Sequence, residues 1–257
     1  MPKLKAVLFD LDDTLISWAN FVDTWRAQEM RHLGYLYDYV HAQGYQLNAP
    51  LEALHEQFSR RVRVAWEKAR STLRAPHFGV IVTETLTHFG LDCSEEPLSM
   101  EACIEAYRWG PYDGVTVFPD VPDALAALRQ HGVEIGIVTN AYHTAPMRDR
   151  ELAALGLLGF FPRPETRITA ADVGYLKPHP YIFRHALAVM DSAPEETVFV
   201  GDNLSADIDG AQKVGMRGVL RTVHGRTPLQ RMIVPDASVD DLHQLLHVLD
   251  EWYPDWR

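Results

Sequence analysis

The sequence has only two cysteines, Cys93 and Cys103, and they do not form a CxxC pair. We therefore expect neither a disulfide framework nor a zinc site with cysteine ligands, and a reducing cytoplasm is the expected location. Long apolar runs are also missing, which argues against a segment that spans a bilayer. The start of the chain, Met1 to Lys5, leads into a short apolar run that ends at acidic residues, unlike a signal peptide.

Positive charge is scarce as well. Lysine and arginine number 24 against 35 aspartate and glutamate residues, which gives a formal net charge of -11. Because binding to a phosphate backbone needs a basic surface, we expect no nucleic-acid partner, and local groups must bind any anionic substrate. Apolar residues, in contrast, are plentiful, at 47% of the 257 residues. That share is typical of a globular enzyme with a large core.

Short apolar runs alternate with helical patterns through most of the chain. Strands are expected at 6–9, 133–138, 167–170, 197–200 and 218–220. Helices are expected between them, at 121–131, 146–155, 178–190 and 205–214. A run that is apolar throughout, such as 6–9, is typical of a parallel strand buried on both faces. The alternation predicts an α/β fold with a doubly wound, Rossmann-like parallel sheet, and the first run as its central strand.

A long helical segment interrupts this alternation between the first and second strands, and it contains no convincing strand. Helices are expected there near 51–73, 79–89 and 99–108. Glycine and proline break the periodicity around 110–118, where a hinge is expected. We interpret residues 16–112 as an inserted α-helical cap domain, and residues 1–15 and 113–257 as the core domain.

Two carboxylates stand two positions apart where the first strand ends, in the run FDLDDTL that contains Asp10 and Asp12. In an extended backbone both side chains would point to the same side. Open α/β sheets bind ligands at the carboxyl ends of their strands, so the pair is placed for chemistry. The alternative is that Asp12 or a neighbour only caps a following helix.

Polar groups also follow later strands. Thr139 and Asn140 come directly after the second strand, where a hydroxyl and an amide can donate to a phosphate oxygen. An ordinary helix cap is an equally good interpretation of this pair. Lys177 precedes a proline that can open the next helix. Because lysines in loops are usually solvated, Lys177 alone predicts little.

The fourth group is acidic. Asp202 follows the strand expected at 197–200, and Asp207 lies in the first turn of the next helix. Magnesium in proteins favours one or two carboxylates together with water and substrate phosphate, which suits Asp202 with help from Asp10. Asp207 is also placed to be a partner of the helix dipole.

These groups occur in order, each after an expected strand, as DxDxT, TN, KPxP and GDxxxxD motifs. Together they resemble the haloacid dehalogenase-like (HAD) superfamily, in its phosphatase branch with a helical cap of the C1 type inserted after the first motif. The resemblance covers essentially the whole chain. It implies a magnesium-dependent phosphatase that hydrolyses a small phosphorylated metabolite through an aspartyl-phosphate intermediate.

The resemblance implies roles for the acidic residues. Asp10 would be the nucleophile, and a carboxylate can attack phosphorus only if a cation relieves the repulsion between the two. Asp12 would protonate the leaving oxygen and later take a proton from water. Mg²⁺ would be held by Asp10, Asp202 and the backbone carbonyl of Asp12.

It also implies roles for the remaining polar residues. Thr139, Asn140 and Lys177 would hold the oxygens of the transferring phosphoryl group, because phosphoryl transfer depends on positioning and electrostatics. Asp207 would hold the waters of the metal or the side chain of Lys177.

Other functions are open at this point. A sugar-phosphate mutase or a phosphonate hydrolase of the same fold would share the motifs, and the second would need a cap lysine such as Lys68 to form a Schiff base. Asp12 argues against a dehalogenase, which lacks an acid two residues after its nucleophile. A non-enzymatic phospho-receiver or binding scaffold is the alternative from another class, although receivers have no inserted cap.

A basic cluster stands out in the expected cap of this acidic chain. Arg63 and Arg70 would share one face of a helix with Glu67. One interpretation is an ion-paired, solvated face. The other is that Arg63 and Arg70 bind a second anionic group of the substrate.

Overall fold

The computed structural model describes residues 3–21, 23–110, 112–223 and 232–257. Its main feature is a sheet of parallel strands in the order β5-β4-β1-β6-β7-β8. The strands are β1 (Ala6–Phe9), β4 (Glu134–Thr139), β5 (Arg167–Thr169), β6 (Thr197–Gly201), β7 (Arg217–Arg221) and β8 (Ala237–Val239). The expected α/β fold with a central first strand is confirmed.

Strand β1 is central because its side chains are apolar on both faces. All of its residues are fully buried, and successive ones belong to different hydrophobic clusters, Leu8 to one and Phe9 to the other. Phe9 is in register with Ile137 of β4 and with Val200 of β6. The residue after Phe9 therefore leaves the sheet between the ends of two other strands.

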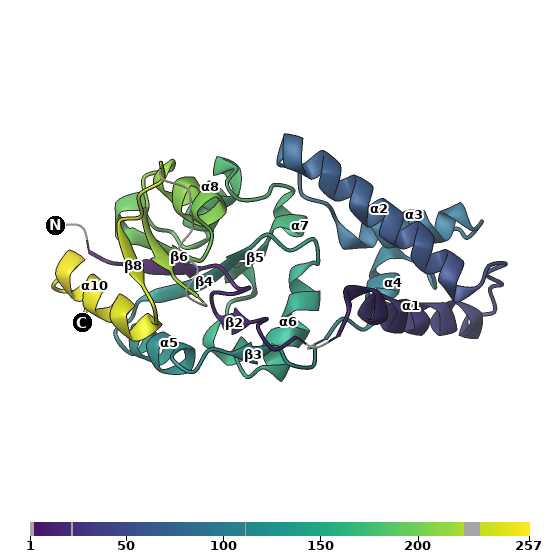
Figure 1. Ribbon diagram of the computed structural model, residues 1–257, viewed down its shortest axis with the longest axis horizontal. Coiled ribbons are helices and arrows are strands. Elements are labelled where there is room, and N and C mark those ends of the chain that lie inside the picture. Colours follow the sequence, from purple (N-terminus) through teal and green to yellow (C-terminus); the bar gives the residue numbers. More distant parts are fainter. Residues whose placement is uncertain (1–2, 22, 111, 224–231) are drawn as a thin grey trace.

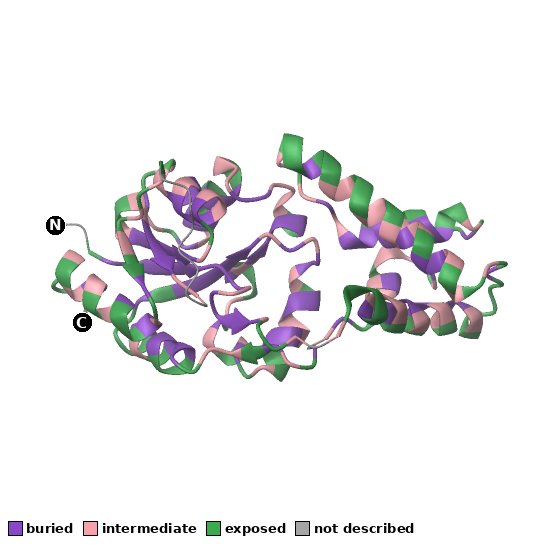
Figure 2. Ribbon diagram, viewed as in Figure 1, coloured by how far each residue is buried: buried purple, intermediate pink, exposed green. Residues whose placement is uncertain are grey.

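Helices cover both faces of the sheet (Figure 1). Helices α5 (Val121–Gln130) and α10 (Leu242–Trp252) pack with the cluster that contains Phe9, and α8 (Pro180–Val189) packs with the cluster of Leu8. Figure 2 shows that burial is concentrated in the strands and on the helix sides that face them. The other helices of this region are α6 (Ala145–Ala154), α7 (Ala170–Val173) and α9 (Gly210–Gln212).

Two elements differ from the sequence prediction. Part of the helix expected at 205–214 is a π-helical segment, η4 (Leu204–Asp209), in which Asn203 accepts hydrogen bonds from two following backbone amides. These two bonds cap the first turn of the segment. The edge strand β8 is not predicted, because its three residues show no clear apolar pattern and only one of them is buried.

The segment between β1 and β4 is mainly helical, as expected. Its helices, called here the helical insertion, are α1 (Trp25–Ala42), α2 (Leu51–Thr72), α3 (Phe78–His88) and α4 (Met100–Tyr107). Figure 1 shows them together at one end of the molecule, facing the carboxyl ends of the parallel strands. The division into cap and core domains at residues 15/16 and 112/113 stays a prediction. Within the described ranges, no helix combines the length and the apolar character that a bilayer span requires.

A short antiparallel pair joins the two connections that lead to the insertion. Its strands are β2 (Ile16–Ser17) and β3 (Thr116–Val117). The expectation of no strand at Ile16 is therefore wrong, because a two-residue pairing with a distant segment leaves no pattern in the sequence. Gly114, near β3, has a φ of +86°, and a Cβ there would lie 1.9 Å from the carbonyl oxygen of Asn20. Only glycine permits so close an approach.

Candidate active site

The polar groups of the four motifs meet at the carboxyl ends of β1, β4 and β6. They line a cavity of about 190 Å³, called here the acidic cavity. Its walls are Asp10, Asp12, Thr139, Asn140, Lys177, Asp202, Asn203, Ala206 and Asp207. These residues come together because neighbouring parallel strands end at the same edge of the sheet.

Lys177 lies among the acids. Its Nζ is 2.6 Å from Oδ1 of Asp10 and 2.7 Å from Oδ1 of Asp207, and all three residues are buried. Asn140 fixes the backbone of Lys177, since its Nδ2 donates to the carbonyl oxygen and its Oδ1 accepts from the amide of that residue. The other oxygen of Asp10 accepts a hydrogen bond from Thr14 Oγ1 at 3.3 Å. The geometry therefore points Lys177 at the carboxylate of Asp10.

The charges of the site do not balance. Burial raises the pKa of Asp10 to about 8, although Lys177 opposes the shift. Burial also acts to lower the pKa of Lys177, but the charges of Asp10 and Asp207 outweigh it and hold that pKa above its usual value. Lys177 therefore stays cationic, and the acids around it, if all were ionised, would carry more negative charge than it neutralises. A further cation would favour the ionised form of Asp10 at neutral pH.

Three carboxylates are placed to hold such a cation. One oxygen each of Asp10, Asp202 and Asp207 lie within 4.8 Å of one another. Burial, with help from the charge of Asp207, raises the pKa of Asp202 to about 6. This excess of acidic oxygens fits a hard divalent metal. The side chain of Asp12 lies outside the cluster, and the metal-binding role expected for its backbone carbonyl stays a prediction.

Asp12 has partners of its own. Its Oδ1 accepts hydrogen bonds from Nη2 of Arg148 at 2.7 Å and from the indole Nε1 of Trp18 at 2.9 Å. Its Oδ2 accepts from Thr139 Oγ1 at 3.4 Å. The two carboxylates of the first motif therefore face different cations, Lys177 for Asp10 and Arg148 for Asp12.

The sequence analysis missed Arg148 and its neighbour Glu151. Both are buried on α6, and Nε of Arg148 lies 3.1 Å from Oε2 of Glu151. Burial raises the pKa of Glu151 to about 7, which Arg148 opposes. An arginine and a glutamate three positions apart usually form a surface ion pair, so their spacing gave no signal of a buried site. The fold alone places them beside Asp12.

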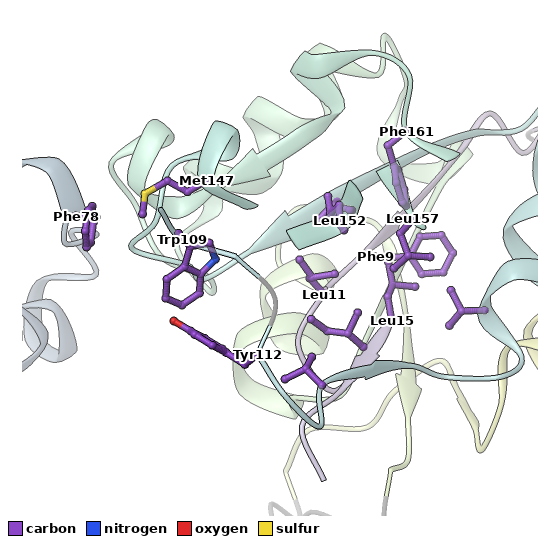
Figure 3. Packing of buried hydrophobic residues seen from close by; sticks show 14 of the residues in the cluster. Phe9, Leu11, Leu15, Phe78, Trp109, Tyr112, Met147, Leu152, Leu157 and Phe161 are labelled. Carbon is purple, nitrogen blue, oxygen red and sulfur yellow. The ribbon is translucent and has the colours of Figure 1, made fainter. Parts of the chain in front are cut away.

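A second cavity, called here the aromatic cavity, adjoins the first. It measures about 420 Å³, and Asp12 and Asn140 line both cavities. Its other walls are Trp18, Trp25, Glu29, Val62, Trp66, Tyr107, Trp109, Tyr112, Ala141, Tyr142, His143 and Arg148. In the view of Figure 3, Trp109 and Tyr112 lie between Phe78 of the insertion and Leu11 of the core. The aromatic cavity thus extends from the acidic cavity toward the helical insertion.

Arg63 and Arg70 are not among the residues that line these two cavities. Both are exposed on α2. Arg63 instead lines a separate hollow together with Arg26 and Glu52. Their role in binding a second anion stays a prediction, and it requires a substrate that reaches beyond the aromatic cavity.

Comparison with known proteins points to one family. The family model described as "haloacid dehalogenase-like hydrolase" matches residues 4–215 of this chain. The glyceraldehyde 3-phosphate phosphatase of Methanopyrus kandleri is 31% identical over 96% of this chain and 98% of its own. The ribulose-1,5-bisphosphate 5-phosphatase of Halopiger xanaduensis is 31% identical over 84% of this chain and 83% of its own.

Solved structures share the fold. A 2-haloacid dehalogenase from Pseudomonas syringae superposes with a TM-score of 0.62 at 29% identity, over 97% of this chain and 99% of the other. A HAD phosphatase from Thermococcus onnurineus gives a TM-score of 0.57 at 25% identity, over 96% of this chain and 98% of the other. Both a dehalogenase and a phosphatase are therefore similar to this chain along nearly its whole length.

Proposed function

The chain belongs to the haloacid dehalogenase-like hydrolase family, and from this premise we propose that it is a Mg²⁺-dependent phosphatase that releases phosphate from a small metabolite through a phosphorylated Asp10. The observation that carries the proposal is the acidic cavity, where Asp10 lies between Lys177 and carboxylates able to hold a cation. The curated relatives reported above are named for glyceraldehyde 3-phosphate and ribulose 1,5-bisphosphate, which are both small phosphate esters.

In the first step, an oxygen of Asp10 attacks phosphorus in line. A bond forms between that oxygen and phosphorus, while the bond from phosphorus to the alcohol oxygen breaks. Lys177 neutralises charge on the transferring oxygens, and the hydroxyl of Thr139 lies in the same cavity to donate to them. Asn140 keeps Lys177 in place through its two backbone hydrogen bonds.

Asp12 serves as the acid in this step and as the base in the next. It gives a proton to the alcohol oxygen as the alcohol leaves, then takes a proton from the water that attacks the phosphorylated Asp10. Phosphate departs, and both carboxylates return to their starting state. Asp12 suits this role because it lines both cavities and so stands where the alcohol separates from phosphorus.

The acidic cluster would hold the metal. Asp10 and Asp202 would ligate Mg²⁺ with the backbone carbonyl of Asp12, and Asp207 would hold its waters as well as Lys177. The bound ion supplies positive charge that lets a carboxylate approach an anionic phosphate. Asn203 donates its backbone amide to Oδ2 of Asp207 and so fixes that acid next to the cluster.

The alternative activities have less support. A dehalogenase would not need the acid at Asp12, which here is held by three side-chain donors. A phosphonate hydrolase would need a lysine from the cap, but Lys68 is exposed on α2 and lines neither cavity described above. A mutase would need the same motifs but would have to keep water from the phosphorylated Asp10.

The proposal is tested by trapping the intermediate. Asp12→Asn keeps the nucleophile but loses the base, a change that typically costs about 10²- to 10⁴-fold in rate. The phenolate of an aryl phosphate leaves without a proton, so the first step should survive and the second should stall. Mass spectrometry after acid quenching should then show one phosphoryl group on the peptide that contains Asp10.

Two controls accompany this experiment. Asp10→Asn should form no covalent intermediate and release no phosphate, and wild-type activity should vanish in excess chelator and return with Mg²⁺. A label on a histidine or serine, or near-normal turnover by Asp10→Asn, would show that Asp10 is not the nucleophile.

A further inference from the structure

Aromatic side chains form much of the wall of the aromatic cavity. Trp18 and Trp25 lie with ring centroids 5.4 Å apart, and Tyr112 lies 5.8 Å from Trp18 and 5.9 Å from Trp25. Trp25 is 54% exposed even though it belongs to this group. An exposed tryptophan at the wall of a cavity offers a ring face that a flat ligand can cover.

Two buried ring nitrogens in the same walls lack hydrogen-bond partners. They are Nε1 of Trp109 and Nε2 of His143, and no described residue bonds to either. Both side chains are at least nine-tenths buried, and their rings lie 3.6 Å apart. A buried donor without a partner costs free energy, so a ligand that accepts from it gains affinity. The indole nitrogen can only donate, which means that the matching ligand atom is an acceptor.

The charged and amide groups of the cavity walls are already engaged within the protein. Asp12 and Arg148 are paired with each other, and Asn140 is bound to the backbone of Lys177. Glu29 accepts from His55 at 3.0 Å. A sugar carries several hydroxyl groups that each need a partner, and groups already in use cannot supply them without losing their own.

We propose that the alcohol part of the substrate is a flat aromatic or heteroaromatic ring that carries an oxygen or nitrogen acceptor. This inference rests on the proposed phosphatase activity and adds its substrate class. The ring lies against the cluster formed by Trp18, Trp25 and Tyr112, its acceptor meets the indole N–H of Trp109, and its ester oxygen reaches Asp12 at the junction of the two cavities. A volume of about 420 Å³ suits one such small molecule.

The test compares phosphate esters of primary alcohols, so that the leaving oxygens are alike. The three pyridylmethyl phosphates carry a ring with an acceptor, benzyl phosphate carries a ring without one, and ribose 5-phosphate carries hydroxyl groups. We expect kcat/KM to be highest for one pyridylmethyl isomer, and to be about tenfold or more higher for benzyl phosphate than for ribose 5-phosphate. Equal or higher kcat/KM for ribose 5-phosphate overturns the inference.

Variants locate the effect in the cavity. Trp25→Ala should lower the ratio of kcat/KM for benzyl phosphate to that for ribose 5-phosphate about tenfold. Trp109→Phe keeps the ring but removes the N–H, so the advantage of the pyridylmethyl ester over the benzyl ester should disappear. Tyr45→Ala is the matched control, because Tyr45 is an exposed aromatic residue of the same region that lines neither cavity. Unchanged ratios in both tryptophan variants overturn the inference.

Acetyl phosphate separates this inference from the proposed function, because its leaving group is too small to fill the aromatic cavity. If acetyl phosphate is hydrolysed in a reaction that depends on Asp10, but aromatic esters are not preferred, the proposed substrate class is refuted and the proposed phosphatase activity is supported. No hydrolysis of any ester would refute the phosphatase. Calorimetry of pyridylmethanol with the Asp10→Asn variant measures binding to the aromatic cavity without turnover. Absence of binding there also overturns the inference.

Discussion

At the scale of single residues, the first motif gives two identical side chains different surroundings. Asp10 is buried against Lys177, which shares its charge with Asp207. Asp12 is more accessible and is held by Arg148 and Trp18. A carboxylate that attacks phosphorus and one that moves protons need different environments. The structure provides them within three consecutive residues.

Arg148 is expected to act as a positioning residue for Asp12. In Arg148→Met, the carboxylate keeps only the weaker hold of Trp18 and Thr139. We expect kcat for a primary-alcohol phosphate to fall about 10- to 100-fold while KM changes less, since misplacing a proton donor affects the transition state. Steady-state kinetics on the purified variant measures this split.

The control for Arg148→Met must separate positioning from loss of folding. Glu151→Gln keeps the arginine and its bond to Asp12, so its kcat should stay closer to that of the wild type. Arg148→Lys should recover part of the activity because it restores a cation. If Arg148→Met and Glu151→Gln lose kcat equally and in step with their melting temperatures, the role of Arg148 is only structural.

At the scale of elements, Asp120 joins three segments of the core. Its Oδ1 accepts from Arg221 of β7 at 2.8 Å, and its Oδ2 accepts from the amide of Leu242 at the start of α10, at 2.6 Å. Arg221 in turn donates to the carbonyl oxygen of Thr14, in the first motif, at 2.9 Å. This network connects the loop that follows β1 to β7 and to the start of α10.

The network predicts a specific loss of stability in acid. Burial acts to raise the pKa of Asp120, but Arg221 and the Leu242 amide outweigh it and leave that pKa below its usual value. The stabilisation is therefore complete above the unfolded-state pKa of about 3.9 and is lost as pH falls through the lower folded-state pKa. Asp120→Asn should lower the free energy of unfolding by about 3–5 kcal/mol near neutral pH, because it leaves Arg221 unpaired.

Urea unfolding at several values between pH 7 and pH 3 measures this effect. The difference between wild type and Asp120→Asn should be constant down to about pH 5 and should shrink below about pH 4. Asp123→Asn is the control, since Asp123 is exposed on the same helix. A difference that does not change with pH would contradict the assignment of the acid-sensitive stability to Asp120.

The sequence predicts those elements and residues whose signal is local. Apolar runs buried on both faces mark β1, β4 and β6, and polar residues directly after them identify Asp10, Thr139 and Asp202. Arg148 escapes prediction because its role depends on α6 packing beside another segment of the chain. The β2 strand escapes for the same reason, since its partner is distant in sequence. The missing information is thus tertiary contact rather than propensity.

At the scale of the whole molecule, the chemistry and much of the aromatic wall come from different regions. The acidic cavity is built at the ends of the sheet, whereas Trp25, Val62 and Tyr107 reach the aromatic cavity from helices of the insertion. Trp18 lies on the connection between them and touches Asp12. The position of the insertion is therefore coupled to the proposed acid.

Gly114 allows the two connections between the core and the insertion to pack closely. In Gly114→Ala the new Cβ would meet the backbone of Asn20. The alanine would also have to adopt a left-handed conformation, which costs about 1–3 kcal/mol for residues other than glycine. We expect a lower melting temperature and a lower kcat, because Asn20 lies two residues from Trp18. Gly159→Ala is the matched control, as a Cβ there meets nothing within 4 Å. If Gly114→Ala has the same activity and melting temperature as Gly159→Ala, the expectation is contradicted.

The β2–β3 pair also bears on how the chain folds. β1 and β4 are hydrogen-bonded neighbours although the whole insertion separates them in sequence, and closing so long a loop costs conformational entropy. Pairing Ser17 with Thr116 brings the ends of the insertion together at its root. Once this pair has formed, the loop that must close between β1 and β4 consists only of the residues from β1 to Ser17 and from Thr116 to β4. We therefore expect a chain that joins Ser17 directly to Thr116 still to bring β1 beside β4.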